Sequence, residues 1–170
     1  MKNKLLKGAI IISIGGFVTK LIGAVYRTFL TNILGSTGIG LYQMAFPLYS
    51  LLLTLSSTGV PNGIAKQIAS GEDGKVVLYS ALKLFIPASL IAFILMAVFS
   101  GQIATVQGNS LAKNCYLLLS PSLLLVSVIS CFRGYFQGQM NMVPTAVSQI
   151  TEQIVKLILG LTLCYKLLPN

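Results

Sequence analysis

The sequence predicts an all-α fold, a polytopic bundle of transmembrane helices. Of its 170 residues, 55% are hydrophobic and only 9% are charged, whereas a soluble domain carries roughly 25% charged residues. The apolar residues fall into five runs, each close to the roughly 20 residues that a helix needs to cross a bilayer. We therefore expect a multi-pass membrane protein in which residues 1–170 form a single transmembrane domain.

The five predicted spans are separated by short connections. The spans are expected near residues 9–32, 41–64, 76–100, 113–134 and 144–167. The connections at 35–40, 70–74, 107–110 and 137–141 are rich in residues that favour turns. Connections this short predict an up-and-down bundle in which consecutive spans run antiparallel.

Charge is distributed unevenly, with 12 basic residues against 3 acidic ones. Most basic residues flank apolar runs, which is the distribution of the positive-inside rule and not of a nucleic-acid-binding surface. We therefore predict a cytoplasmic N-terminus and no nucleic-acid partner. The first apolar run contains Lys20 and lacks an Ala-x-Ala ending, so we expect an uncleaved span there and not a signal peptide.

Catalytic and metal-binding residue types are scarce. The sequence contains no His, which excludes a Ser-His-Asp triad and a His-based metal site. Cys115, Cys131 and Cys164 stand alone in apolar runs without CxxC spacing, as packing residues do. We expect neither an enzyme nor a bound cofactor.

The first span carries a stripe of small and basic residues at helical spacing. Its members are Ser13, Gly16, Lys20, Gly23, Arg27 and Thr31. A basic residue at the centre of a membrane helix costs roughly 3 kcal/mol on insertion scales. Lys20 and Arg27 could line an aqueous cavity suited to an anionic group, or they could snorkel or pair with an acid elsewhere.

Prolines inside the predicted spans indicate kinks, and three of them are candidate hinges. Pro47 and Pro61 lie in the second span and Pro121 in the fourth. Each removes a backbone hydrogen bond, and neighbouring Ser and Thr hydroxyls can satisfy the freed carbonyls. We predict conformational hinges at these prolines; a merely packed polar seam is the alternative. Lys83, in the third span, is expected to snorkel.

The fifth span begins at Pro144 and carries its polar residues on one face. Those residues are Gln149, Glu152, Gln153 and Lys156. Glu152 precedes Lys156 by four residues, the favourable order for a helical ion pair. The pair could be purely structural. Alternatively, Glu152 could serve ion or proton coupling, and Lys156 could join a substrate-facing cationic cluster.

Several motifs spread over the chain resemble those of one group of bacterial membrane proteins. The motifs are Lys4-Leu-Leu-Lys-Gly-Ala, Thr19-Lys-Leu-Ile-Gly, Gly38-Ile-Gly-Leu-Tyr-Gln-Met, Gly59-Val-Pro, Arg133-Gly-Tyr-Phe-Gln-Gly and Pro144-Thr-Ala-Val-Ser-Gln-Ile-Thr-Glu-Gln-Ile-Val-Lys. The group is the polysaccharide biosynthesis proteins of the stage V sporulation protein B type. They belong with the lipid II flippases in the multidrug/oligosaccharidyl-lipid/polysaccharide exporter superfamily.

The resemblance implies a two-lobe fold in the bacterial plasma membrane that flips a lipid-linked sugar precursor by alternating access. Basic residues of the first helix line the cavity in the lipid II flippases, and Lys20 and Arg27 are the nearest matches here. The partners implied are membrane lipids and a precursor bearing a pyrophosphate, with no protein partner indicated. Since the chain resembles only the first five helices of that pattern, we expect a fragment or truncated form. An ion-coupled exporter of organic cations and a non-transporting membrane remnant are the alternatives.

Overall fold

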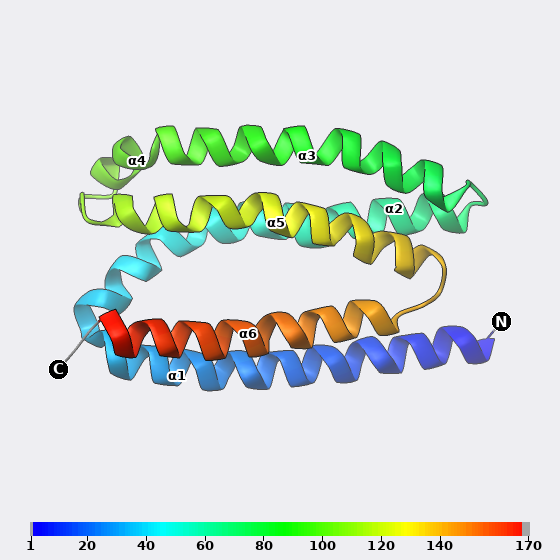
Figure 1. The fold of residues 1–170 in the computed structure, drawn as a ribbon, viewed down its shortest axis with the longest axis horizontal. Helices are drawn as coiled ribbons and strands as arrows, with labels where there is room; N and C mark the ends of the chain where they lie inside the picture. The colour runs from blue at the N-terminus through cyan, green and yellow to red at the C-terminus, as the bar shows by residue number, and fades with distance from the viewer. Residues whose placement is uncertain (1, 168–170) are drawn as a thin grey trace. The chain divides into compact units, whose positions relative to one another are not determined.

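A computed structural model describes residues 2–167, which are helical except for short turns (Figure 1). In chain order the elements are α1 (Lys2–Thr54), the π-helix η1 (Leu55–Gly59), α2 (Val60–Ala69), α3 (Gly74–Val98), α4 (Ser100–Val106), α5 (Ala112–Gly138) and α6 (Val143–Leu167). No strand occurs in this described range, so the predicted all-α class is confirmed.

A single kink divides α1. The helix has 53 residues, about 80 Å at 1.5 Å per residue, while the hydrocarbon core of a bilayer is about 30 Å thick. Gly35 breaks the helical geometry with φ 64° and ψ −172°, a conformation that essentially only glycine adopts. The predicted connection over 35–40 was therefore wrong in extent, because only Gly35 leaves the helix. Because the helix continues on both sides of Gly35, the N–H and C=O groups of residues 36–40 stay hydrogen-bonded within it. In a bilayer, backbone groups without such partners would be costly, since no water is present to bond them.

Four helical stretches are long and apolar enough to cross a membrane. They are Leu6–Ala69, Gly74–Val98, Ala112–Gly138 and Val143–Lys166. The first of them covers 64 residues and is divided at Gly35. Counting its two parts separately gives five apolar segments.

The chain separates into two compact units, one of Met1–Ile39 with Met140–Asn170 and the other of Gly40–Gln139. In the first unit, the part of α1 before the kink lies along α6. Residues in contact rise together along both helices, from Gly8 beside Met142 to Tyr26 beside Gly160. The two helices are therefore parallel, as Figure 1 also shows.

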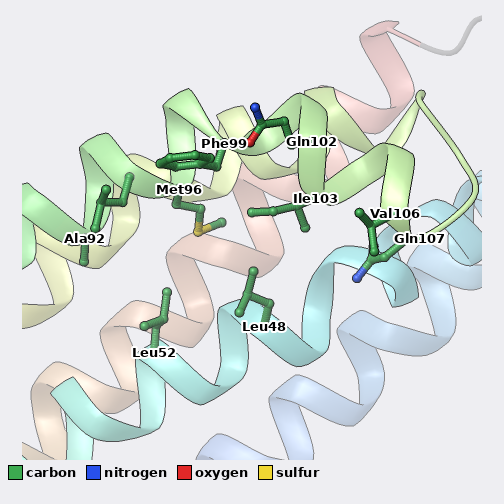
Figure 2. A pocket seen from close by; sticks show the side chains of 10 residues that line it. Leu48, Leu52, Ala92, Met96, Phe99, Gln102, Ile103, Val106 and Gln107 are labelled. Carbon is green, nitrogen blue, oxygen red and sulfur yellow. The ribbon is translucent and has the colours of Figure 1, made fainter.

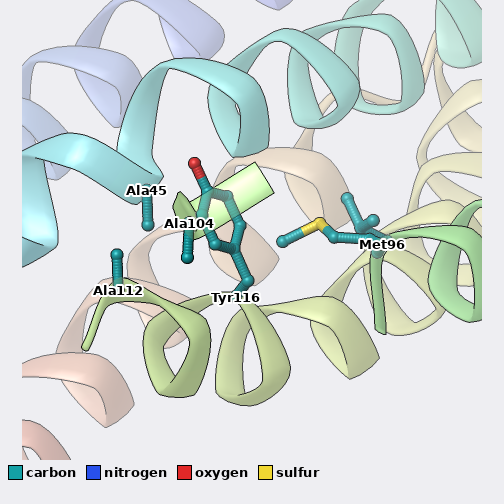
Figure 3. Close-up of a cluster of buried hydrophobic side chains, with 6 residues drawn as sticks. Ala45, Met96, Ala104, Ala112 and Tyr116 are labelled. Atoms are coloured by element: carbon teal, nitrogen blue, oxygen red, sulfur yellow. The ribbon is translucent and has the colours of Figure 1, made fainter. Parts of the chain in front are cut away.

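The second unit packs α3 and α5 with the helix that runs from residue 40 through η1 and α2. One buried cluster surrounds Tyr116, which points between Ala45, Ala104 and Met96 in Figure 3. A second cluster contains Val60, Ile64, Val77, Ala81 and Cys131. The turn after α2 and the end of α5 meet at one end of this unit, since a Cβ at Gly138 would lie 2.7 Å from Ile68 Cβ.

The predicted hinge prolines occupy different local structures. Pro47 and Pro121 lie inside helices, and Pro61 is the second residue after the π-helix. Because proline has no N–H, Pro61 leaves a carbonyl of the preceding turn without its helical donor. π-helical turns frequently mark functional positions, but a hinge role for all three prolines stays a prediction.

The hydroxyls of the second predicted span make bonds of two kinds. Ser50 donates to Pro47 O at 2.9 Å and Thr54 to Ser50 O at 2.7 Å, both within their own helix. Ser56 instead meets the hydroxyl of Ser127 on α5 at 3.4 Å. The contact between helices thus involves Ser56.

Candidate functional site: a cationic face on the α1–α6 pair

Glycine contacts hold the start of α1 close to α6. A Cβ on Gly15 would lie 2.9 Å from Ala146 Cβ, and one on Gly160 would lie 2.7 Å from the ring of Tyr26. Real Cβ atoms do not approach so closely, so glycine at these positions sets the helix separation. We call this contact line, through Gly8, Gly15, Tyr26, Ala146 and Gly160, the glycine seam.

The predicted stripe on the first span lies beside this seam and not in it. A Cβ on Gly16 would meet nothing within 4 Å, and one on Gly23 would only reach Gln153 Oε1 at 3.6 Å. Lys20 and Arg27 are both exposed. The small residues of the stripe therefore leave room beside Lys20 and Arg27, whereas Gly8 and Gly15 provide the close approach.

Helical phase places the predicted site residues on one side of the pair. At about 100° per residue, Lys20 and Arg27 lie about a third of a turn from the glycine seam on α1. Glu152 and Lys156 lie within about a quarter turn of the seam on α6, in the opposite rotational sense. Since the helices are parallel and face each other, these two offsets point to the same side. We call the four residues the cationic face.

Their heights along the pair also agree. Lys20 falls between the contact of Gly15 with Ala146 and the contact of Gly23 with Gln153, close to the level of Glu152. Arg27 follows Tyr26 directly in the sequence, and Tyr26 contacts Gly160. Three basic side chains and one acidic side chain thus occupy a short length of the same face, which gives it a net positive charge.

Tyr26 joins the two helices at this level. The Nζ atom of Lys156 lies over the Tyr26 ring, 5.2 Å from its centroid. A cation–π contact of this kind orients the ammonium group and leaves its N–H donors available. The sequence pairs Tyr26 with Arg27, as aromatic and basic residues pair at a membrane boundary or in a pore, but it contains no signal for the contact of Tyr26 with Lys156.

Glu152 is exposed but has an interaction partner in the structure. A role in ion coupling would therefore compete with an existing contact. Among the described residues, no group of three or more His, Cys, Asp or Glu side chains could hold a metal ion. Cys115, Cys131 and Cys164 are free thiols.

Lys83, expected to snorkel, lies outside the cationic face. Its Nζ is 4.4 Å from the centroid of the Tyr79 ring, one helical turn earlier on α3. This local contact needs no other helix. Lys83 therefore offers a basic residue for comparison with those of the cationic face.

Comparison with known proteins identifies the family. The model of the polysaccharide biosynthesis protein family matches residues 5–169. The chain belongs to this family. The resemblance seen in the sequence motifs is thereby confirmed, and the apolar helices together with the family make the chain a multi-pass bacterial membrane protein.

Two curated relatives of the chain come from Bacillus subtilis (strain 168). Stage V sporulation protein B is 34% identical over 163 residues, covering 92% of this chain and 32% of the relative. Lipid II flippase MurJ is 28% identical over 183 residues, covering 99% and 34% respectively. The chain thus spans about a third of the length of these relatives. No solved structure matches the chain significantly.

Proposed function

We propose that the chain forms the first part of a flippase for a lipid-linked oligosaccharide or peptidoglycan precursor. The observation that carries this proposal is the cationic face, where Lys20, Arg27 and Lys156 gather on one side of the glycine seam. The relative named as a lipid II flippase supports the substrate class. The relatives' activity belongs to chains about three times longer, so the proposal concerns a part of such a protein.

The chemistry of the face suits a pyrophosphate group. Lys and Arg donate charge-assisted hydrogen bonds to phosphate oxygens, and Arg can do so with two parallel N–H donors. These interactions strengthen where water is excluded, because the effective dielectric constant falls. The Lys156 ammonium, held over Tyr26, would be oriented before the substrate arrives.

Alternating access requires helices that change their arrangement. The Gly35 kink, the π-turn before Pro61, and Pro47 and Pro121 inside their helices supply places where a helix can bend. We propose Pro47, Pro61 and Pro121 as hinges and Glu152 as the coupling carboxylate. We also propose a cytoplasmic N-terminus, which would place Lys66, Lys75 and Arg133 together at the inner end of the second unit.

The test uses a chimaera in which this chain replaces the corresponding third of stage V sporulation protein B. The chimaera is reconstituted in vesicles, and the outward movement of a fluorescent lipid-linked precursor is measured. Loss of a charged hydrogen bond worth about 1.5–3 kcal/mol predicts that Lys20→Gln and Arg27→Gln each slow transport roughly tenfold or more. Lys83→Gln removes the same charge from α3 and should leave the rate unchanged. Unchanged transport in both cationic-face variants would refute the proposal.

Export of organic cations, the alternative, fits the face less well. A cationic substrate is attracted by carboxylates, and the face offers Glu152 against three basic residues. If the chimaera exported organic cations and moved no lipid-linked precursor, this alternative would replace the proposal.

A further inference from the structure

Three helices of the second unit each bring one serine to a small cavity. The cavity has a volume of about 140 Å³ and is lined by Ser56, Ser89 and Ser127 together with hydrocarbon side chains such as Leu52 and Phe85. Ser56 lies in η1, Ser89 in α3 and Ser127 in α5. The hydroxyls are therefore the polar groups of an otherwise apolar wall, and we call this space the serine cavity.

Two of these hydroxyls do not make the hydrogen bond that is usual in a helix. Ser and Thr side chains inside helices commonly donate to a carbonyl one turn earlier, as Ser89 does to Ile86 O at 3.0 Å. Among the described residues, Ser56 and Ser127 are hydrogen-bonded only to each other, at 3.4 Å between the two Oγ atoms. This distance is longer than the roughly 2.5–3.0 Å of an ordinary O–H···O bond. The two hydroxyl protons thus have one weak acceptor between them.

The position of the serine cavity along the helices makes this arrangement costly. Ser127 is 2% exposed and Ser89 is 6% exposed. Both lie near the midpoints of helices that are long and apolar enough to cross a membrane. The middle of a bilayer is roughly 15 Å from the edge of its hydrocarbon core, so water outside the membrane does not reach these groups. A buried hydroxyl without a hydrogen-bond partner is unfavourable in such surroundings.

A larger cavity beside the serine cavity has different chemistry. Its volume is about 740 Å³, and the two cavities have Leu52 and Ala92 in common. In Figure 2, Met96 and Ile103 point toward Leu48 and Leu52 across the larger cavity. None of its described lining residues carries a hydroxyl. The serine cavity is therefore the one whose walls indicate a ligand that forms hydrogen bonds.

We propose that the serine cavity binds water, which bridges the hydroxyls of Ser56, Ser89 and Ser127. A water molecule accepts the hydroxyl proton that has no acceptor in the protein and donates its own protons to the serine oxygens. Buried waters typically make about three such bonds, and a molecule of liquid water occupies about 30 Å³, so the cavity has room for a small cluster. A lipid acyl chain could fill the same volume but would leave the hydroxyls unsatisfied. The site is separate from the cationic face and does not rest on the proposed function.

The experiment measures the transfer of proton magnetisation from water to serine side chains by solid-state NMR. The full chain, isotopically labelled at serine, is reconstituted in phosphatidylcholine vesicles. We expect transfer to the Cβ atoms of Ser56 and Ser127. Ser120 is the matched reference, because it is fully buried on the same helix and donates to Leu117 O at 2.9 Å. It should receive no magnetisation from water, although it lies nearer than Ser127 to an end of α5.

A pair of substitutions tests the role of the hydroxyl. Ser56→Val replaces it with methyl groups and should abolish the transfer to Ser127. Thr54→Val removes a neighbouring hydroxyl that donates to Ser50 O at 2.7 Å within its own helix, and the transfer to Ser127 should persist. Equal transfer to Ser120 and Ser127, or transfer to Ser127 that survives Ser56→Val, would overturn the proposal. Transfer from acyl-chain protons in place of water would overturn it too and assign the cavity to lipid.

A second measurement uses smaller substitutions and reports on the bridge itself. Ser56 and Ser89 share no direct hydrogen bond, so bridging water is the link through which Ser56→Ala and Ser89→Ala would influence each other. In detergent titrations, their combined effect on the unfolding equilibrium constant should differ from the product of the single effects by roughly fivefold. Ser56→Ala combined with Ser120→Ala should give the simple product. If both pairs gave the simple product, no water would bridge Ser56 and Ser89.

Discussion

The two units of this chain differ in how much of their helices is buried. In the unit of α6 and the start of α1, none of the apolar window of α6 is buried, and Lys20 and Arg27 stand on an open face. In the unit of residues 40–139, 33% of the corresponding window of α5 is buried. Its buried polar residues are the neutral Ser89, Ser100, Ser120, Ser127 and Ser130.

The difference is between a closely packed unit and an open pair of helices. A helix with many buried contacts resists rearrangement, because closely packed interiors tolerate little change of shape. A parallel pair joined along one seam leaves most of each helix free to face a substrate, lipid or further protein. The four charged residues of the cationic face are all exposed, and burying them without partners would be costly.

The largest expected effect lies in the packed unit, at Gly134. A Cβ there would lie 2.8 Å from Ile64 Cβ, 2.8 Å from Pro61 Cα and 2.9 Å from Pro61 O. Backbone atoms cannot move aside as a flexible side chain can, so Gly134→Ala should destabilise the fold by roughly 1–3 kcal/mol. Titration with a denaturing detergent, followed by circular dichroism, measures the loss.

Gly63→Ala is the matched control for this substitution. It lies in α2, and a Cβ there meets nothing within 4 Å. Removing a helical glycine in open space should stabilise the helix by roughly 0.5–1 kcal/mol. If the two substitutions had equal effects, the close approach of α2 and α5 would not be what stabilises this unit.

A smaller effect is expected at the glycine seam, where neighbouring positions make a direct comparison. Gly15→Ala brings two methyl groups to 2.9 Å, whereas Gly16→Ala fills open space. We expect Gly15→Ala to weaken the pairing of α1 with α6 by about 1 kcal/mol. Gly16→Ala should leave the pairing unchanged.

Disulfide formation offers a local measure of this pairing. A Cβ at Gly8 would lie 3.9 Å from Met142 Cβ, close to the mean of about 3.8 Å in disulfides. With the three native cysteines replaced by Ala, Gly8→Cys with Met142→Cys should cross-link rapidly. Gly15→Ala should slow cross-linking roughly fivefold. A similar slowing by Gly16→Ala would show that the seam runs elsewhere.

The features that the sequence predicted are those that depend on one helix at a time. The apolar runs, the spacing of Lys20 with Arg27, and the spacing of Glu152 with Lys156 follow from hydropathy and a period of 3.6 residues. Turn residues likewise marked the breaks after α2 and α5. The Gly35 kink was harder to place, since Gly35, Gly38 and Gly40 all permit a break and the sequence does not rank them.

The features that the sequence missed depend on how two helices meet. Gly15 and Gly16 are neighbouring glycines that the sequence does not distinguish. Only the position of Ala146 on α6 shows that Gly15 is at the helix contact and Gly16 is not. The contact between Tyr26 and Lys156 likewise joins residues 130 positions apart in the sequence. A single sequence contains no signal for such a pairing, and the phase of α1 relative to α6 has to come from the structure.

The smallest expected effects compare the two tyrosines that hold helices together. The hydroxyl of Tyr116, a fully buried residue, lies 3.2 Å from Met44 O and 2.9 Å from Gln107 Oε1. Tyr116→Phe therefore leaves these acceptors without a donor and should cost about 1 kcal/mol in the free energy of unfolding.

Tyr26 interacts with Lys156 through its ring, so Tyr26→Phe should cost almost nothing. Tyr26→Leu, which removes the ring, should cost roughly 0.5–1 kcal/mol. The same detergent titration distinguishes these variants. Equal losses for Tyr26→Phe and Tyr116→Phe would mean that hydroxyl groups, and not a cation–π contact, join helices in both units.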